Sequence, residues 1–217
     1  DSAVLRLGAM LTQAKNNGSG SRIDKKGVAA AYRWGIGERN EFQASLYHLD
    51  NHNGMNYGLP WIRPTPRQSA SNPAGSPPST ATTMPLDPKA YYGLASDYNA
   101  GSATTFTLGS SDHLARDHEI TTQVRLGRYS RDQRASTIRF APAAAQPGGV
   151  EASLASFGPG TVFNRGAPLK IQDLDTVYAQ SDYSGKFDAL GMRHQVQAGV
   201  DLAIEKRQVF GARNAAQ

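Results

Sequence analysis

The sequence predicts an all-β fold: an antiparallel transmembrane β-barrel, of which this chain of 217 residues supplies an incomplete portion of about seven strands. Two observations predict it. Stretches of about ten or more residues alternate apolar and polar side chains, which is the period of a strand with one apolar face. The linkers between these stretches alternate between long and short, as in outer-membrane barrels, where long loops are extracellular and short turns are periplasmic.

The clearest alternation lies near the end of the chain. One face of this stretch carries Val196, Ala198, Val200, Leu202 and Ile204. The opposite face carries Gln195, Gln197, Gly199, Asp201 and Glu205. The aliphatic face runs for roughly 30 Å at about 3.3 Å per residue, which is long for a strand of a globular protein.

The other strands rest on the same alternation. The expected strands span residues 2–12, 27–36, 41–47, 104–114, 117–129, 170–187 and 193–208. Short turns at 37–40, 115–116 and 188–191, a break at 16–21, and long stretches at 51–102 and 131–169 join them. Loops of that length count against a compact soluble domain but are usual outside a barrel. Both long loops therefore fall at the same end of the strands.

Composition excludes several other classes of protein. A hydrophobic content of 39%, a mean hydropathy of -0.50 and the lack of a run of about 18 apolar residues exclude a helical membrane protein. The absence of cysteine excludes disulfide scaffolds, thiol catalysis and zinc ribbons. The net charge of +5 suits an anionic ligand, but Lys and Arg are scattered, so no nucleic-acid partner is expected. No catalytic motif is present, so the sequence does not predict an enzyme.

Seven strands do not complete a bacterial barrel, because such barrels have an even number of strands and no open edge. Two explanations stay open. An eighth strand could complete a small barrel, or the chain could be a portion of a far larger one. No internal boundary divides the chain, so residues 1–217 are treated as one continuous sheet.

Several short runs of residues favour the larger barrel. They are Gly27-Val28-Ala29-Ala30, Arg33-Trp34-Gly35, Tyr47-His48-Leu49, Tyr57-Gly58-Leu59-Pro60, Tyr92-Gly93-Leu94, Asp97-Tyr98, His113, Arg125, Arg128-Tyr129, Ser184-Gly185-Lys186-Phe187, His194 and Gly199-Val200. In this order and spacing they resemble TonB-dependent siderophore receptors of the catecholate type. The resemblance spans nearly the whole chain, and it implies a barrel of about 22 strands, filled by an N-terminal plug, in the bacterial outer membrane.

The resemblance also implies a function and partners. The implied function is binding of a ferric siderophore and its transport with energy passed through TonB. The implied partners are that chelate, the TonB complex through a plug region absent from this chain, and outer-membrane lipid and lipopolysaccharide; the full-length form is expected to be a monomer. No cofactor is implied beyond the transported chelate. Residues 1–217 would be part of the barrel domain, without the plug and the C-terminal strands. The alternative is a small outer-membrane or soluble β-barrel module for binding or adhesion, without transport.

A ferric tris-catecholate is anionic and aromatic, so its receptor needs cationic and aromatic side chains at the outer mouth. The first long loop offers six candidates for binding the ligand: Tyr57, Trp61, Arg63, Arg67, Tyr91 and Tyr92. In a competing interpretation, Trp61, Tyr91 and Tyr92 pack the loop or belong to the aromatic girdle at the membrane interface.

Three further groups have structural interpretations. Tyr32, Trp34, Phe106, Tyr183 and Phe187 are expected to face lipid, several of them near strand ends. Arg33, Glu41, Arg125, Asp182, Lys186, Asp201 and Glu205 are expected to face inward, as a hydrated network that touches the plug. His48, Asp50 and His52 share one side of a strand, but this spacing is too common to predict a metal site.

Overall fold

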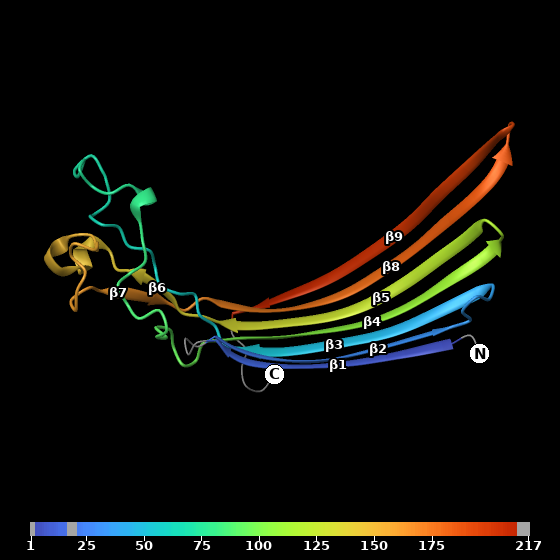
Figure 1. The fold of residues 1–217 in the computed structure, drawn as a ribbon, viewed down its shortest axis with the longest axis horizontal. Helices are drawn as coiled ribbons and strands as arrows, with labels where there is room; N and C mark the ends of the chain where they lie inside the picture. The colour runs from blue at the N-terminus through green and yellow to red at the C-terminus, as the bar shows by residue number, and fades with distance from the viewer. Residues whose placement is uncertain (1–2, 17–20, 212–217) are drawn as a thin grey trace.

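The computed structural model describes residues 3–16 and 21–211. Seven long strands form one antiparallel sheet, in which each pairs with the next long strand along the chain (Figure 1). They are β1 (Ala3–Asn16), β2 (Ser21–Trp34), β3 (Asn40–Asn53), β4 (Tyr98–Ala115), β5 (His118–Arg134), β8 (Leu169–Ala189) and β9 (Met192–Phe210). Within the described residues β1 and β9 do not pair with each other, so the sheet is open. The seven predicted strands are confirmed.

Most of the strands are longer than the alternation of side chains predicted. β3 continues to Asn53, β4 begins at Tyr98 and β5 continues to Arg134, so residues expected in loops extend the sheet. These extensions are largely polar on both faces and carry no hydropathy alternation, but their main chains stay paired in register. The expected strand start at Ser2 and most of the break at 16–21 lie outside the described residues.

The two long connections lie at one end of the sheet and the short turns at the other (Figure 1). Residues 54–97 form the first loop, between β3 and β4, and residues 135–168 form the second loop, between β5 and β8. The second loop contains a small sheet that the sequence did not predict, formed by β6 (Thr137–Phe140) and β7 (Phe163–Gly166). Single 3₁₀ turns occur at η1 (Pro78–Thr80), η2 (Ala143–Ala145) and η3 (Pro147–Gly149).

The register gathers apolar side chains on one side of the sheet, here called the apolar face. One row across the strands reads Leu7, Ala30, Leu46, Phe106, Leu126, Val177 and Ile204. The next row toward the turns reads Leu5, Tyr32, Ala44, Leu108, Val124, Ala179 and Leu202. Nearer the turns, Trp34 stacks on both Tyr32 and Phe42, with ring centroids 5.4 Å apart in each pair. Such a band of exposed apolar side chains, ending in aromatic rings, suits lipid and not water.

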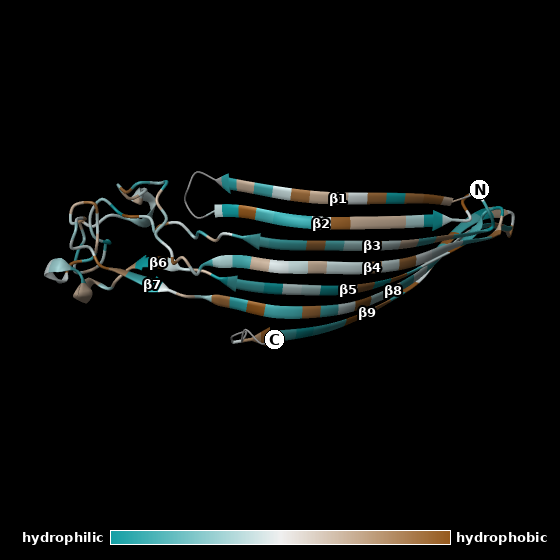
Figure 2. Ribbon diagram, turned by 90° about the horizontal axis from the view of Figure 1, so that it is seen from below, coloured by the Kyte–Doolittle hydropathy of each residue, from teal (hydrophilic) through white to brown (hydrophobic). Residues whose placement is uncertain are grey.

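The apolar band ends before the strands do. The row nearest to it on the loop side reads Val28, His48, Thr104, Arg128, Asp175 and Lys206. In this row Arg128 Nε lies 3.4 Å from Asp175 Oδ1. Figure 2 shows β2 hydrophilic near its loop end and more apolar beyond. The strands therefore extend several residues beyond the apolar band toward the two long loops.

The opposite side, here called the polar face, carries all seven charged residues that were expected to face inward. On it Arg33 bonds to Glu41, and Arg125 Nε donates to Thr107 Oγ1 at 3.2 Å. Two hollows of about 530 and 520 Å³ lie along β5, β8 and β9 and are lined mainly by residues of this side. The five aromatic residues that were expected to face lipid all lie on the apolar face, as predicted. The sheet therefore has the two-sided character that the alternation predicted.

Buried hydrophobic side chains lie mainly outside the sheet. In the described part of the chain they are Ile62, Met84, Ala135, Ala141 and Ile171, and of these only Ile171 belongs to a strand. No helix in the described ranges is long and apolar enough to span a membrane. The two loops thus have a small core of their own, which positions the residues considered next.

Candidate functional site

The two long loops contact each other beyond the end of the sheet (Figure 1). The main-chain N–H of Leu154 donates to the carbonyl oxygen of Arg63 at 2.8 Å. The guanidinium of Arg165 donates to the carbonyl oxygen of Tyr92 at 3.0 Å. Because these bonds join main-chain atoms of one loop to the other, the loops form one structural unit.

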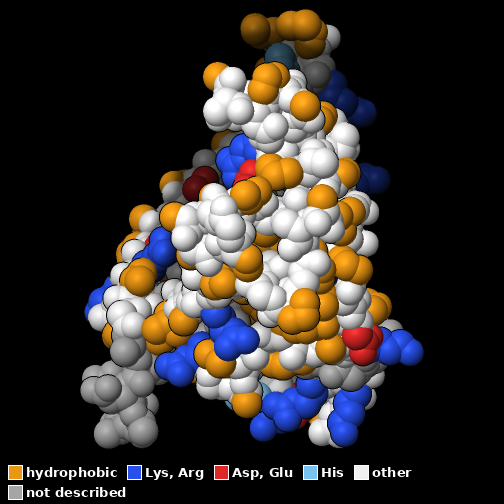
Figure 3. All heavy atoms as spheres, turned by 90° about the vertical axis from the view of Figure 1, so that its left-hand side faces the viewer, with side chains coloured by type: hydrophobic (Ala, Val, Ile, Leu, Met, Phe, Trp, Pro, Cys, Tyr) orange, Lys and Arg blue, Asp and Glu red, His pale blue; other side chains and the backbone are white. Residues whose placement is uncertain are grey.

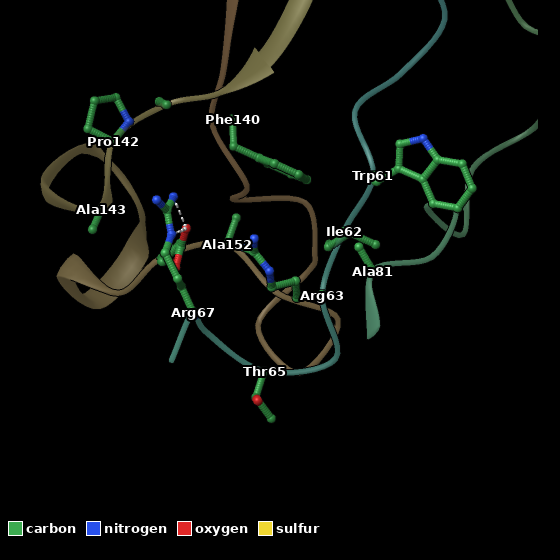
Figure 4. Close-up of a pocket in the computed structure, with 12 residues that line it drawn as sticks. Trp61, Ile62, Arg63, Thr65, Arg67, Ala81, Phe140, Pro142, Ala143 and Ala152 are labelled. Atoms are coloured by element: carbon green, nitrogen blue, oxygen red, sulfur yellow. Dashed lines mark hydrogen bonds and ion pairs between the residues drawn. The ribbon is translucent and has the colours of Figure 1, made fainter. Parts of the chain in front are cut away.

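A cavity of about 640 Å³ lies between the two loops and is called the loop cavity below. Trp61, Ile62, Arg63 and Arg67 line it from the first loop, and Phe140 and Glu151 line it from the second (Figure 4). Its volume falls within the range of about 300–1,000 Å³ that is usual for small-molecule sites. The structure therefore brings together three of the six predicted residues, Trp61, Arg63 and Arg67.

Arg67 is engaged by Glu151. Its Nη2 and Nε atoms donate to Glu151 Oε1 at 2.6 and 3.0 Å, and its main-chain N–H donates to Oε2 at 2.8 Å. The hydrogen bond to Glu151 raises the pKa of Arg67. Burial alone would raise the pKa of Glu151, but the hydrogen bonds from Arg67 and the charges of Arg67 and Arg63 outweigh it and lower that pKa. The charge of Arg67 is therefore offset by a carboxylate beside it.

Arg63 is in a different state. Figure 4 shows its side chain directed from the first loop toward Ala152 and Phe140. No carboxylate among the described residues pairs with it at ion-pair distance, and its Nε atom is buried without a hydrogen-bond partner. A buried N–H without a partner is unfavourable. Arg63 is therefore the group in the loop cavity with capacity left to bind an anion.

Trp61 and Tyr92 border a second, smaller hollow. Trp61 is 68% exposed. It lines a space of about 280 Å³ within the first loop, together with Met84 and Tyr92. The hydroxyl of Tyr92 donates to the carbonyl oxygen of Asp87 at 3.2 Å, which holds the ring in the loop. The exposed indole of Trp61 offers a flat surface on which an aromatic ligand can stack.

Tyr57 and Tyr91 lie away from the loop cavity. Gln133 Nε2 donates to the hydroxyl of Tyr57 at 3.1 Å, which places Tyr57 at the loop end of β5. The hydroxyl of Tyr91 lies 2.8 Å from Asp97 Oδ2 and 3.0 Å from the carbonyl oxygen of Leu94. Burial, followed by the neighbouring Asp97 carboxylate, raises the pKa of Tyr91. These contacts favour the interpretation in which Tyr91 packs the loop.

Asp97 fixes the base of both loops. Its Oδ2 atom accepts hydrogen bonds from the main-chain N–H groups of Leu94 at 3.1 Å and Ser136 at 3.0 Å. Burial would raise the pKa of Asp97, but hydrogen bonds from Ser136, Tyr91 and Leu94 outweigh it and lower that pKa. One carboxylate therefore ties the end of the first loop to the start of the second.

His48, Asp50 and His52 do share one side of β3, as their spacing indicated. His48 Nδ1 lies 2.8 Å from Thr104 Oγ1, and the ring of His52 stacks on Tyr98. The described residues contain no group of three or more His, Asp or Glu that could hold a metal ion. The structure gives this trio local contacts and no metal site.

The loop end of the molecule carries an excess of positive charge. Its basic residues are Arg63, Arg67, Lys89, Arg139 and Arg165, and its acidic residues are Asp87, Asp97 and Glu151. Figure 3 looks onto this end and shows more Lys and Arg than Asp and Glu side chains. Such a surface attracts an anionic ligand by its electrostatic field.

Phe140 and Glu151 complete the loop cavity and were not predicted from the sequence. Glu151 did carry a signal, because it is the only acidic residue between Asp132 and Asp173. Phe140 carried none. Its position depends on the pairing of β6 with β7, and strands of four residues are too short for hydropathy to reveal.

Comparison with known proteins gives relatives among siderophore receptors. No protein-family model matches the chain. The catecholate siderophore receptor Fiu of Escherichia coli O157:H7 is 23% identical over 218 residues, which cover 97% of this chain and 27% of the relative. The closed crystal form of the ferric-catecholate import receptor Fiu from E. coli K12 gives a TM-score of 0.77 at 21% identity, over 97% of this chain and 29% of that chain. The siderophore receptor PiuA from Acinetobacter baumannii gives a TM-score of 0.64 at 18% identity, over 95% of this chain and 26% of that chain.

The chain spans little more than a quarter of the length of its curated relative. The similarity in structure confirms the predicted fold class, an incomplete portion of a transmembrane β-barrel. The similarity in sequence confirms the resemblance to a siderophore receptor of the catecholate type.

Proposed function

We propose that this chain is part of the barrel wall of a bacterial outer-membrane receptor that binds ferric siderophores of the catecholate class and transports them inward. The observation that carries the proposal is the open seven-stranded sheet with one continuous apolar face, since it resembles a ferric-catecholate import receptor over 97% of the chain. Residues 1–217 then belong to the barrel domain, and the plug and the remaining strands belong to other parts of the full-length protein. The relatives are named as receptors, which supports transport over catalysis.

The two faces of the sheet suggest the partners of the full-length protein. The apolar face would contact lipid, and the polar rows beyond it would meet the headgroups and sugars of lipopolysaccharide. The polar face would surround the plug, through which the TonB complex supplies energy. The apolar band needs no second copy to cover it once it lies in lipid, so the full-length protein is expected to be a monomer.

The loop cavity is the proposed place of ligand contact in this chain. Arg63 would donate to an anionic oxygen of the chelate, because it lines the loop cavity and, within the described residues, no carboxylate pairs with it at ion-pair distance. Trp61 would stack on a catechol ring. Arg67 would contribute less than Arg63, because Glu151 already accepts its hydrogen bonds. Tyr57, Tyr91 and Tyr92 would support the loops that carry these residues.

Growth on single ferric siderophores tests the function. The full-length protein would be expressed in a bacterial strain that lacks its own catecholate receptors, with each ferric siderophore supplied as the sole iron source. We expect growth on at least one ferric catecholate, and we expect it to be lost when TonB is removed. Growth on no catecholate would overturn the ligand class, and growth that persists without TonB would overturn the mechanism.

Substitutions in the loops test the proposed contacts. We expect Arg63→Ala to weaken binding of the ferric catecholate by about tenfold or more, since hydrogen bonds to charged groups contribute about 1.5–3 kcal/mol. Lys89→Ala is the matched control, because it removes a loop cation that does not line the loop cavity. Equal affinities of the two variants would remove Arg63 from the proposed site.

The adhesion or binding module remains the alternative function. It requires a sheet that closes on itself, whereas β1 and β9 are unpaired with each other in the described part of the chain. Folding of the isolated chain as a stable monomer in detergent would favour it.

A further inference from the structure

The loop cavity holds three charged side chains, and their arrangement sets the charge that a ligand meets. Arg63 and Arg67 come from the first loop, and Glu151 comes from the second. Glu151 accepts two hydrogen bonds from the side chain of Arg67, whereas within the described residues Arg63 has no carboxylate at ion-pair distance. The cavity therefore presents one uncompensated cation out of the two that the sequence supplies.

We propose that Glu151 determines the charge selectivity of the loop cavity: by neutralising Arg67 it leaves Arg63 as the uncompensated cation and limits the preference for highly anionic chelates. The inference rests on the proposed function, in which the loops bind a ferric chelate. Glu151 acts through Arg67, so it is a residue that sets specificity without having to touch the chelate.

The position of Glu151 does not depend on the side chain of Arg67 alone. The main-chain N–H of Arg67 donates to Glu151 Oε2 at 2.8 Å, and this bond does not involve the side chain of Arg67. The neighbouring backbone is also fixed, because Leu154 N–H donates to the carbonyl oxygen of Arg63. The two charges of the ion pair between Arg67 and Glu151, called the bridge below, can therefore be altered one at a time while the loops keep their contact.

Two ferric catecholates of different charge separate the effect of charge from that of ring chemistry. A tetradentate bis-catecholate binds Fe³⁺ as a monoanion, and a hexadentate tris-catecholate binds it as a trianion. Both present catechol rings to Trp61 and oxygen atoms to Arg63. One additional uncompensated cation at about 8 Å in a high dielectric favours the trianion over the monoanion by about fivefold.

The test uses the full-length receptor and three variants: Glu151→Gln, Arg67→Gln and the double variant. The measured quantity is the affinity for the tris-catecholate divided by the affinity for the bis-catecholate. We expect Glu151→Gln to raise this ratio by about fivefold and Arg67→Gln to lower it by about fivefold. The double variant lacks the bridge but has the wild-type net charge, so its ratio is expected to return to within about twofold of the wild type.

The double variant decides between charge and loop structure. A ratio near that of the wild type supports the proposal, even where both affinities fall because the loops loosen. Single variants that leave the ratio unchanged, or a double variant whose ratio follows either single variant, would overturn it. Asp117→Asn is the control, because it removes one negative charge from the short turn between β4 and β5, at the opposite end of the sheet from the loop cavity, and should change the ratio less than Glu151→Gln does. A wild-type receptor that binds neither chelate contradicts the proposed function instead.

Discussion

The sheet and the loops of this molecule are stabilised in opposite ways. The sheet exposes its apolar side chains, among them Leu202 at 56% and Val200 at 70%, and is held together by paired main chains. The loops bury Ile62 and Met84 and are joined by side-chain hydrogen bonds, as an ordinary soluble domain would be. The sheet therefore needs lipid to cover its apolar face, whereas the loops bury their own apolar side chains and can stand in water.

The same difference assigns separate tasks to the two regions. A wall whose stability comes from lipid and main-chain pairing tolerates little change of charge on the apolar face. Loops with a small core of their own and hydrogen bonds between side chains can vary in sequence without disturbing the sheet.

The largest expected effect follows from a charge on the apolar face. Val124→Arg places a guanidinium in the middle of the band, and we expect it to lower the free energy of unfolding of the full-length protein in lipid vesicles by about 2–4 kcal/mol. Gln123→Arg is the matched control, because the adjacent residue of β5 lies on the polar face. Urea titration in vesicles measures both. Equal losses for the two variants would contradict the assignment of the faces.

A smaller and more local effect is expected from the core of the loops. Ile62 is 1% exposed, and Ile62→Ala should destabilise the contact between the loops by about 2 kcal/mol through lost burial and the cavity left behind. We expect faster proteolysis within residues 54–97, with the urea midpoint of the barrel unchanged. Val150→Ala, at an exposed position of the second loop, is the control. A shift of the barrel midpoint by Ile62→Ala would show that the two regions are not separate.

Acid should loosen the loops while the sheet stays folded. The pKa values of Asp97 and Glu151 are both lowered in the folded loops, so the open loops bind more protons than the closed ones at acidic pH. The stabilisation is therefore fully present above the ordinary pKa values of 3.8 and 4.5 and is lost as the pH falls below them.

Spin labels on the two loops measure this opening. The chain contains no cysteine, so Ser79→Cys and Ala144→Cys provide one labelled position in each loop. The distance distribution is expected to be narrow at about pH 7 and to broaden below about pH 4. The same pair in an Asp97→Asn, Glu151→Gln background should broaden much less on acidification. Loops that open in acid equally in both backgrounds would show that other groups control them.

The smallest expected effect lies at the edge of the apolar band. Asp175→Asn removes an exposed ion pair with Arg128, so we expect the free energy of unfolding to fall by less than about 1 kcal/mol. Val177→Asn, two residues further along the same face, should cost more because its row lies within the band. If the two variants lowered the free energy of unfolding in vesicles by similar amounts, the edge of the lipid would not lie between their two rows.

The sequence predicted the part of the fold that hydropathy encodes. The alternation from Val196 to Ile204 predicted a strand with one side in lipid. The alternation in the second strand placed Trp34 and Arg33 on opposite faces, as the register does. It did not reveal the extension of β2 through Asp24, Lys25 and Lys26, because a strand that rises into water can be polar on both sides. Strand length beyond the band is set by main-chain pairing, which leaves no periodic signal.

The candidate site was only half predictable for a related reason. Trp61, Arg63 and Arg67 could be selected by their chemistry and their closeness along the chain. The pairing of Arg67 with Glu151 joins residues 84 positions apart, and no spacing rule connects two irregular loops over that distance. Which of the two arginines remains available to a ligand could therefore come only from the structure.

The apolar face is expected to lie in lipid up to the row of Leu126, and the strands are expected to continue beyond that row toward the loops. A spin-label scan of residues 120–134 along β5, in the full-length protein in vesicles, tests it most directly through collision with oxygen, which concentrates in lipid. We expect oxygen accessibility to alternate with a period of two, high at Val124 and Leu126, and to fall sharply at Arg128. High oxygen accessibility at Gln123 and Arg125 instead, or no alternation at all, would contradict it.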